Sequence, residues 1–215
     1  MSTADRRTRI ADAAVTVIAE NGLRALTHRA LDTALDLPAG SVSYYFRTRQ
    51  ALLTAVAARI TERSRADFEA ATFGPDVRDS APGTDLSSGE LSGDTGVKPP
   101  TAVVARGIAE WLDRLLSYRR DELLARHTLI LDGRTDPEVR DRLANSFFSV
   151  QRARELFSTR GIDDPRIAED FVAVLEGAVF DRFAGRRRTL PPGSADSVEQ
   201  LTGLVENYLR GVRSQ

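Results

Sequence analysis

The chain has 215 residues, a formal net charge of −1 and no cysteine. The lack of cysteine excludes a disulfide framework, a thiolate nucleophile and a zinc–thiolate site, and the length allows one large domain or two small ones. No apolar run is long enough to predict a membrane span, and the first residues lack the apolar region of a secretion signal. We therefore expect a cytoplasmic protein that makes no contact with a membrane.

Charge is distributed unevenly along the chain. Residues 1–65 contain ten arginines against six acidic residues, a net charge of +4, whereas the remaining 150 residues contain 20 basic and 25 acidic residues, a net charge of −5. Phosphate neutralisation supplies most of the non-specific affinity of proteins for DNA. A basic N-terminal part on an acidic remainder is therefore typical of a modular DNA-binding protein.

The first predicted helix runs from about Arg6 to Glu20. Its apolar residues from Ile10 to Ile18 recur at helical spacing, and Asn21-Gly22 provides a C-terminal cap. We expect this helix to pack on the two helices that follow and to hold them rigid.

Residues 27–53 read as two short helices, a tight turn between them and the start of a third helix. Thr27 is a good N-cap for the first helix, and Pro38 breaks the helical pattern that follows it. The second short helix, Ala39–Tyr45, carries small residues on its outer side, and Thr48 caps the next helix. This layout is that of a helix-turn-helix, whose second helix enters the major groove of DNA.

From about Arg7 to Ile60 the chain resembles the N-terminal DNA-binding domain of the TetR (tetracycline repressor) family. The resemblance rests on Glu20-Asn21-Gly22, on Thr27, on the segment LPAGSV at 37–42, on the block YYF at 44–46 and on RTRQALL at 47–53. Two positions depart from the family pattern. The family usually has tyrosine in place of Ser43, and lysine is commoner than Arg49.

The resemblance implies a helix-turn-helix domain at residues 1–48 and an effector-binding and dimerisation domain at residues 49–215. It assigns phosphate contacts to Thr27, Tyr44, Tyr45 and Arg49, and base contacts to Arg29, Ala39, Gly40, Ser41 and Ser43. Pro38 belongs to the same DNA-facing segment. His28 either touches phosphate or is solvated, and Tyr45 either faces DNA or packs on the first helix.

The remaining residues predict an all-α protein of about nine helices. A long helix from Arg49 to about Ala71 links the two domains, and the composition of residues 73–100 predicts disorder. One long helix beginning at Asp136-Pro137 carries Val139 to Phe157 on its apolar face, another follows Asp164-Pro165, and a last helix begins at Ser194 or Asp196. The resemblance implies that the last two helices form a homodimer interface, with Gly177 and Ala178 allowing close approach; the alternative is a monomer with a buried terminal helix pair.

A small-molecule effector site is expected between the central helices, because ligand sites are mostly apolar with a few polar groups. Its candidate lining is Trp111, Leu115, Tyr118, His127, Leu131, Phe147, Phe148, Gln151, Phe171 and Leu175. Most of these residues could equally form plain core. His127 is the most informative of them, since it interrupts an aliphatic stripe and a buried imidazole needs a polar partner.

No enzyme signature is present among the motifs of the chain, and we predict no metal and no cofactor. Asp132 and Asp136 read as turn and cap residues, and Arg186-Arg187-Arg188 as a solvated loop after a helix end. The sequence therefore predicts a homodimeric repressor that binds a palindromic double-stranded operator and is released by a small molecule. The alternative is a protein that binds or sequesters a small molecule without sequence-specific DNA binding.

Overall fold

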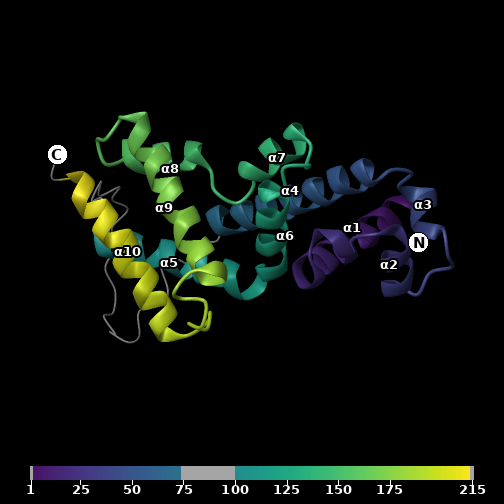
Figure 1. Cartoon of the computed structure of the whole chain (residues 1–215). Helices are drawn as coiled ribbons and strands as arrows, with labels where there is room; N and C mark the ends of the chain where they lie inside the picture. The colour runs from purple at the N-terminus through teal and green to yellow at the C-terminus, as the bar shows by residue number, and fades with distance from the viewer. Residues whose placement is uncertain (1, 74–99, 214–215) are drawn as a thin grey trace, which may run out of the picture.

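The computed structural model describes residues 2–73 and 100–213, and all regular structure in these two ranges is helical (Figure 1). The all-α prediction is confirmed, with ten α-helices in place of about nine. The segment predicted to be disordered, residues 73–100, lies outside the described residues except for its two end positions. The elements are α1 Thr3–Asn21, the 3₁₀ turn η1 Leu23–Ala25, α2 His28–Ala34, α3 Ser41–Tyr45, α4 Arg49–Phe73, α5 Thr101–Tyr118, α6 Arg120–Leu131, α7 Pro137–Ala144, α8 Val150–Ser158, α9 Pro165–Ala184 and α10 Ala195–Arg213.

Short-range capping starts several of these helices at the predicted positions. The hydroxyl of Thr27 accepts the N–H of Ala30 at 3.1 Å, and Thr48 accepts the N–H of Ala51 at 3.0 Å. Asp136 and Asp164 cap α7 and α9 in the same way, each followed by proline in the first turn. These caps satisfy backbone donors that have no partner inside the helix.

The single long helix predicted from Asp136-Pro137 to Phe157 is wrong, because the chain forms α7 and α8 with a break at residues 145–149. Arg126 of α6 donates to the carbonyls of Leu143 at 2.8 Å and Ala144 at 3.0 Å. These carbonyls would otherwise continue the helical ladder. Ser149 then caps α8 by accepting the N–H of Arg152. The break depends on a side chain from another helix, which helical periodicity does not report.

The helices form an elongated molecule with α1, α2 and α3 at one end (Figure 1). We call these three helices and η1 the head, and α5–α10 the body. The long helix α4 runs from the head into the body, and α1 also packs against α6. At the end far from the head, α10 lies along α5. No helix in the described ranges is long and apolar enough to cross a membrane.

Candidate DNA interface

The second helix of the helix-turn-helix, α3, has only five residues and begins at Ser41, two residues later than predicted. Gly40 precedes it with φ of 89°, and Asp36 in the turn has φ of 52°. Both values lie in the left-handed region, where glycine is unstrained and aspartate is tolerated. A helix this short is not stable by itself, so contacts with its neighbours must fix it.

Asp32 of α2 fixes the N-terminal end of α3. Its carboxylate accepts the N–H of Gly40 and the N–H of Val42, each at 2.8 Å, and the residue is 5% exposed. A buried carboxylate is tolerated when backbone donors satisfy it, and its charge also suits the positive end of a helix. Asp32 therefore orients α3 relative to α2, a role that the sequence alone did not indicate.

Arg7 of α1 fixes the other end of α3. Its Nη1 donates to the carbonyl of Tyr45 at 2.7 Å, and its guanidinium lies 4.3 Å from the centre of the Phe46 ring. Phe46 and Val42 are both buried, so one face of α3 is anchored in the core of the head. The opposite face is left for contact with another molecule.

Most residues predicted to contact DNA lie on this outer side. Tyr44 is 79% exposed, and its ring meets the ring of the half-buried Tyr45 edge-on, with 5.2 Å between centres. Ser41 and His28 are also half-buried, and the Ser41 hydroxyl donates to the carbonyl of Pro38. The exposed members of the predicted set are Thr27, Arg29, Pro38, Ala39, Gly40, Ser43, Tyr44 and Arg49.

Tyr45 also packs against the hydrophobic core, which agrees with the second of its two expected placements. Arg49 has internal partners that the resemblance did not include. Its Nη1 donates to the carbonyl of Leu26 at 2.5 Å and its Nη2 to that of Leu23 at 2.7 Å. These bonds attach the start of α4 to the connection between α1 and α2. The phosphate contact predicted for Arg49 stays a prediction.

The residues predicted to bind an effector lie in several places in the body. Leu115, Phe147, Phe148, Phe171 and Leu175 are buried in the core. Trp111 packs edge-on against Phe148, and Phe171 packs against Phe157 and Tyr208. By contrast, Tyr118 is 81% exposed and Leu131 is 71% exposed, so these two side chains lie on the surface.

His127 has the polar partner that its position requires. Its Nδ1 lies 2.7 Å from the carbonyl oxygen of Leu123, and its ring packs between α6 and α9 against Phe180 and Phe183. Burial, the largest influence, lowers the pKa of His127 below its ordinary value of 6.5. The neutral imidazole and two phenyl rings form an aromatic surface on one side of the body.

A separate cavity of about 300 Å³ opens beside α8. Gln151 is the member of the predicted effector set that lines it. The other lining residues, from α8 and the loop before α9, are Arg154, Glu155, Phe157, Ser158, Ile162, Asp163 and Asp164. In the described part of the chain, no cluster of three histidine, aspartate or glutamate side chains could hold a metal ion.

Two consecutive parts of the chain match known protein families. Residues 10–56 match bacterial regulatory proteins of the tetR family, and residues 99–211 match the tetracyclin repressor-like C-terminal domain. The second match alone covers more than half of the chain. No curated protein is significantly similar to this chain.

Several solved structures share the whole arrangement. A member of the TetR family from Streptomyces coelicolor A3, SCO1917, is 25% identical with a TM-score of 0.60, covering 93% of this chain and 98% of that one. The multidrug binding protein EbrR complexed with ethidium is 25% identical with a TM-score of 0.57, at the same two coverages. EbrR complexed with malachite green is 26% identical, also with a TM-score of 0.57 and coverages of 93% and 98%.

The predicted resemblance is therefore confirmed over the head and the body together. The chain belongs to the TetR family of DNA-binding transcriptional regulators.

Proposed function

We propose that this regulator is a homodimeric repressor that acts in the cytoplasm and is released from a palindromic operator by a small molecule. The observation that carries the proposal is the construction of α3. Asp32 and Arg7 fix its two ends, while Ser43 and Tyr44 face outward. A rigid, exposed helix with small residues beside it can approach the floor of the major groove. The net charge of +4 on residues 1–65 also supports the proposal that the head faces DNA.

The outer face of α9 supports a dimer. Ala173, Gly177 and Phe180 recur at helical spacing and are exposed, Phe180 by 42%. Ala178, the other residue expected to allow close approach, is instead buried in the core of its own chain. A Cβ atom added at Gly177 would meet no atom within 4 Å. A second copy of α9 could therefore approach the backbone closely there and cover Phe180. Two copies joined in this way would present two heads to the two half-sites of a palindrome, spaced by about 34 Å.

The aromatic surface around His127 is the part of the body that we propose for the effector. Phe183 offers a ring face there, with 5.9 Å between its centre and that of the imidazole, and Glu176 places a carboxylate oxygen 4.0 Å from His127 Nε2. The multidrug binding protein EbrR has been solved in complex with ethidium and with malachite green, so these two dyes are suitable first probes. Movement of the body on binding would change the separation of the two heads and lower the affinity for the operator.

The decisive experiment is selection of bound sequences from a random pool of double-stranded DNA, at a stated near-physiological salt concentration. We expect a palindrome to be enriched. A folded dimer that enriches no sequence would contradict the proposal. It would favour instead a protein that binds or sequesters small molecules without reading DNA.

Two exposed tyrosines provide a matched pair of variants for this test. Tyr44 on α3 is 79% exposed and Tyr118 at the end of α5 is 81% exposed. Removal of either ring should therefore cost little folding stability. Tyr44→Ala should lower the affinity for the selected operator about tenfold, since it removes a contact of the kind that fixes the register of a protein on DNA. Tyr118→Ala should leave that affinity unchanged.

A further inference from the structure

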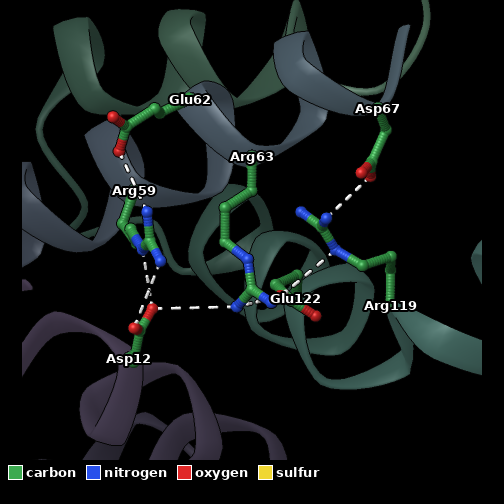
Figure 2. A network of polar contacts seen from close by, with 7 residues as sticks. All are labelled: Asp12, Arg59, Glu62, Arg63, Asp67, Arg119 and Glu122. Atoms are coloured by element: carbon green, nitrogen blue, oxygen red, sulfur yellow. Dashed lines mark hydrogen bonds and ion pairs between the residues drawn. The ribbon is translucent and has the colours of Figure 1, made fainter. Parts of the chain in front are cut away.

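The junction between head and body is built from seven charged side chains of alternating sign (Figure 2). Asp12 comes from α1, and Glu122 and Arg119 come from the start of α6 and the residue before it. The other four lie along α4. We call these seven residues the charge network. Each contacts the next in the order Glu62, Arg59, Asp12, Arg63, Glu122, Arg119 and Asp67.

Each end of this charge network has close pairs of its own. On the head side, Arg59 Nε donates to Asp12 Oδ1 at 2.8 Å. On the body side, Arg119 Nη1 donates to Asp67 Oδ2 at 2.7 Å, and its Nε lies 3.2 Å from Glu122 Oε1. The side chains of Glu122 and Arg119 are 7% and 10% exposed. Charges this far from water must be paired, so the start of α6 is tied firmly to α4.

Arg63 connects the two ends. Its Nη1 lies 2.8 Å from Glu122 Oε1 in the body and 3.7 Å from Asp12 Oδ1 in the head (Figure 2). Among the seven residues it alone pairs with a carboxylate from both α1 and α6. The charge on one nitrogen is therefore shared between two carboxylates that belong to different parts of the molecule.

We propose that Arg63 is the residue through which the body positions the DNA head, by dividing its charge between Asp12 and Glu122. A shift of α6 would change the distance from Arg63 to Glu122. The guanidinium of Arg63 would then move closer to Asp12 or further from it. The head would turn on α4 in response. This inference rests on the proposed regulation of operator binding by the body, and it adds the contact between α1 and α6 to the path through α4.

Removal of Arg63 is a clean test because each of its two partners keeps a second cation. Asp12 keeps Arg59, and Glu122 keeps Arg119. Arg63→Gln should therefore leave head and body folded while it removes the ion pairs that join Asp12 to Glu122 through Arg63. Arg65→Gln is the matched control, since Arg65 is exposed on the same helix and the change in net charge is identical.

The first measurement needs no DNA. The chain has no native cysteine, so Ala34→Cys in the head and Ser158→Cys in the body can carry two spin labels without background. Labelled protein diluted with unlabelled protein gives the distribution of distances between head and body. We expect Arg63→Gln to broaden this distribution and Arg65→Gln to leave it unchanged. Equal distributions for the two variants would overturn the proposal, whether or not the protein has an operator.

The second measurement uses the operator recovered by selection. Arg63→Gln should lower operator affinity about tenfold relative to Arg65→Gln. Glu122→Gln added to Arg63→Gln should cause little further loss of affinity, because the pair between Arg63 and Glu122 is already broken and Arg119 keeps its pair with Asp67. Arg63→Lys should restore affinity, since one ammonium can occupy the place of Nη1. Fully additive losses, or a broadened distribution with unchanged operator affinity, would contradict the positioning role.

A third variant covers the case in which Arg63→Gln does not fold. Asp12→Asn removes the acceptor on the head and keeps the pair between Arg63 and Glu122. Its distance distribution should also be broader than that of Arg65→Gln. A distribution as narrow as that of the control would overturn the proposal.

Discussion

The head and the outer face of α9 expose different chemistry. The outer side of the head presents hydrogen-bonding groups, among them Arg29, Ser43 and Tyr44, whereas the outer face of α9 presents Ala173, Gly177 and Phe180. Phosphates and base edges are recognised by hydrogen bonds and charge, while subunit interfaces are depleted of charged residues in their centre. The two surfaces therefore suit different partners. The head suits a nucleic acid, and the outer face of α9 suits a second copy of the chain.

The head and the body nevertheless use the same device to stabilise their short helices. In the head, Asp32 satisfies backbone donors at the start of α3, and Arg7 satisfies a carbonyl at its end. In the body, Arg126 satisfies carbonyls at the end of α7 and pairs with Glu176 at 2.8 Å. Each device is a charged side chain from a different helix. Substitutions that remove such a side chain should therefore have the largest effects on the free energy of unfolding.

Asp32→Ala is the variant expected to do most harm to the head. It leaves the N–H groups of Gly40 and Val42 without their acceptor. Gly40 is exposed and can bond water, whereas the Val42 donor is buried, so the free energy of unfolding should fall by about 1–3 kcal/mol. Urea unfolding monitored by circular dichroism measures this change. Asp36→Asn is the control, because it removes the same charge from the exposed neighbouring turn and should change stability by less than about 0.5 kcal/mol. Equal effects of the two variants would show that Asp32 does not orient α3.

Gly177→Leu tests the contrast on the outer face of α9. The new side chain has open space in one copy, and leucine favours a helix over glycine by about 1 kcal/mol, so the unfolding of a single copy should become no easier. It would collide with a partner, so sedimentation should report a monomer. Loss of the linked second head should then weaken operator binding by about 100-fold or more.

Gly107→Leu on α5 is the matched control for the dimer interface. Gly107 is also exposed, and a Cβ atom added there also meets no atom within 4 Å. This variant should remain dimeric. If Gly177→Leu were dimeric as well, the close approach would have to occur on another face.

Local features of the sequence predicted the head well, because the relevant contacts are close along the chain. Thr27 and Thr48 each bond a backbone group three residues away, and a cap of that kind can be identified from residue type and spacing. Asp32 and Arg7 could not be assigned in this way. Asp32 reaches Val42 ten residues on, and Arg7 reaches Tyr45 thirty-eight residues on.

The body was predicted less completely for the same physical reason. Periodicity identified α9 and the last helix, since each has its own apolar face. It merged α7 and α8, because the break between them is made by Arg126 from α6. The candidate effector lining also grouped Tyr118 and Leu131 with Phe147, although the first two are exposed and the third is buried. A helical stripe says which residues share a face, but not what covers that face.

Arg49→Ala sharpens the comparison within the head, since Arg49 has a structural partner and a predicted functional one. Loss of its bonds to Leu23 and Leu26 should lower the free energy of unfolding by about 1–2 kcal/mol, given its exposure. Its guanidinium has further N–H groups for a phosphate, so the slope of log affinity against log salt should also fall by about 0.9. Titrations at several salt concentrations measure the slope. A lower stability with an unchanged slope would make Arg49 a purely structural residue.

His127 provides the smallest expected effect and a test of its burial in the body. Because burial lowers its pKa below 6.5, the folded protein binds this proton less readily than the unfolded chain does. The contribution of His127 to stability is therefore complete above about pH 6.5 and declines as the pH falls below that value. Urea unfolding at about pH 7.5 and about pH 5.5 should show a smaller pH dependence in His127→Gln than in the parent protein. Titration of the carboxylates affects both proteins equally. An identical pH dependence would therefore mean that the imidazole of His127 accepts a proton as readily in the folded protein as in the unfolded chain. The proposed effector surface would then be solvated.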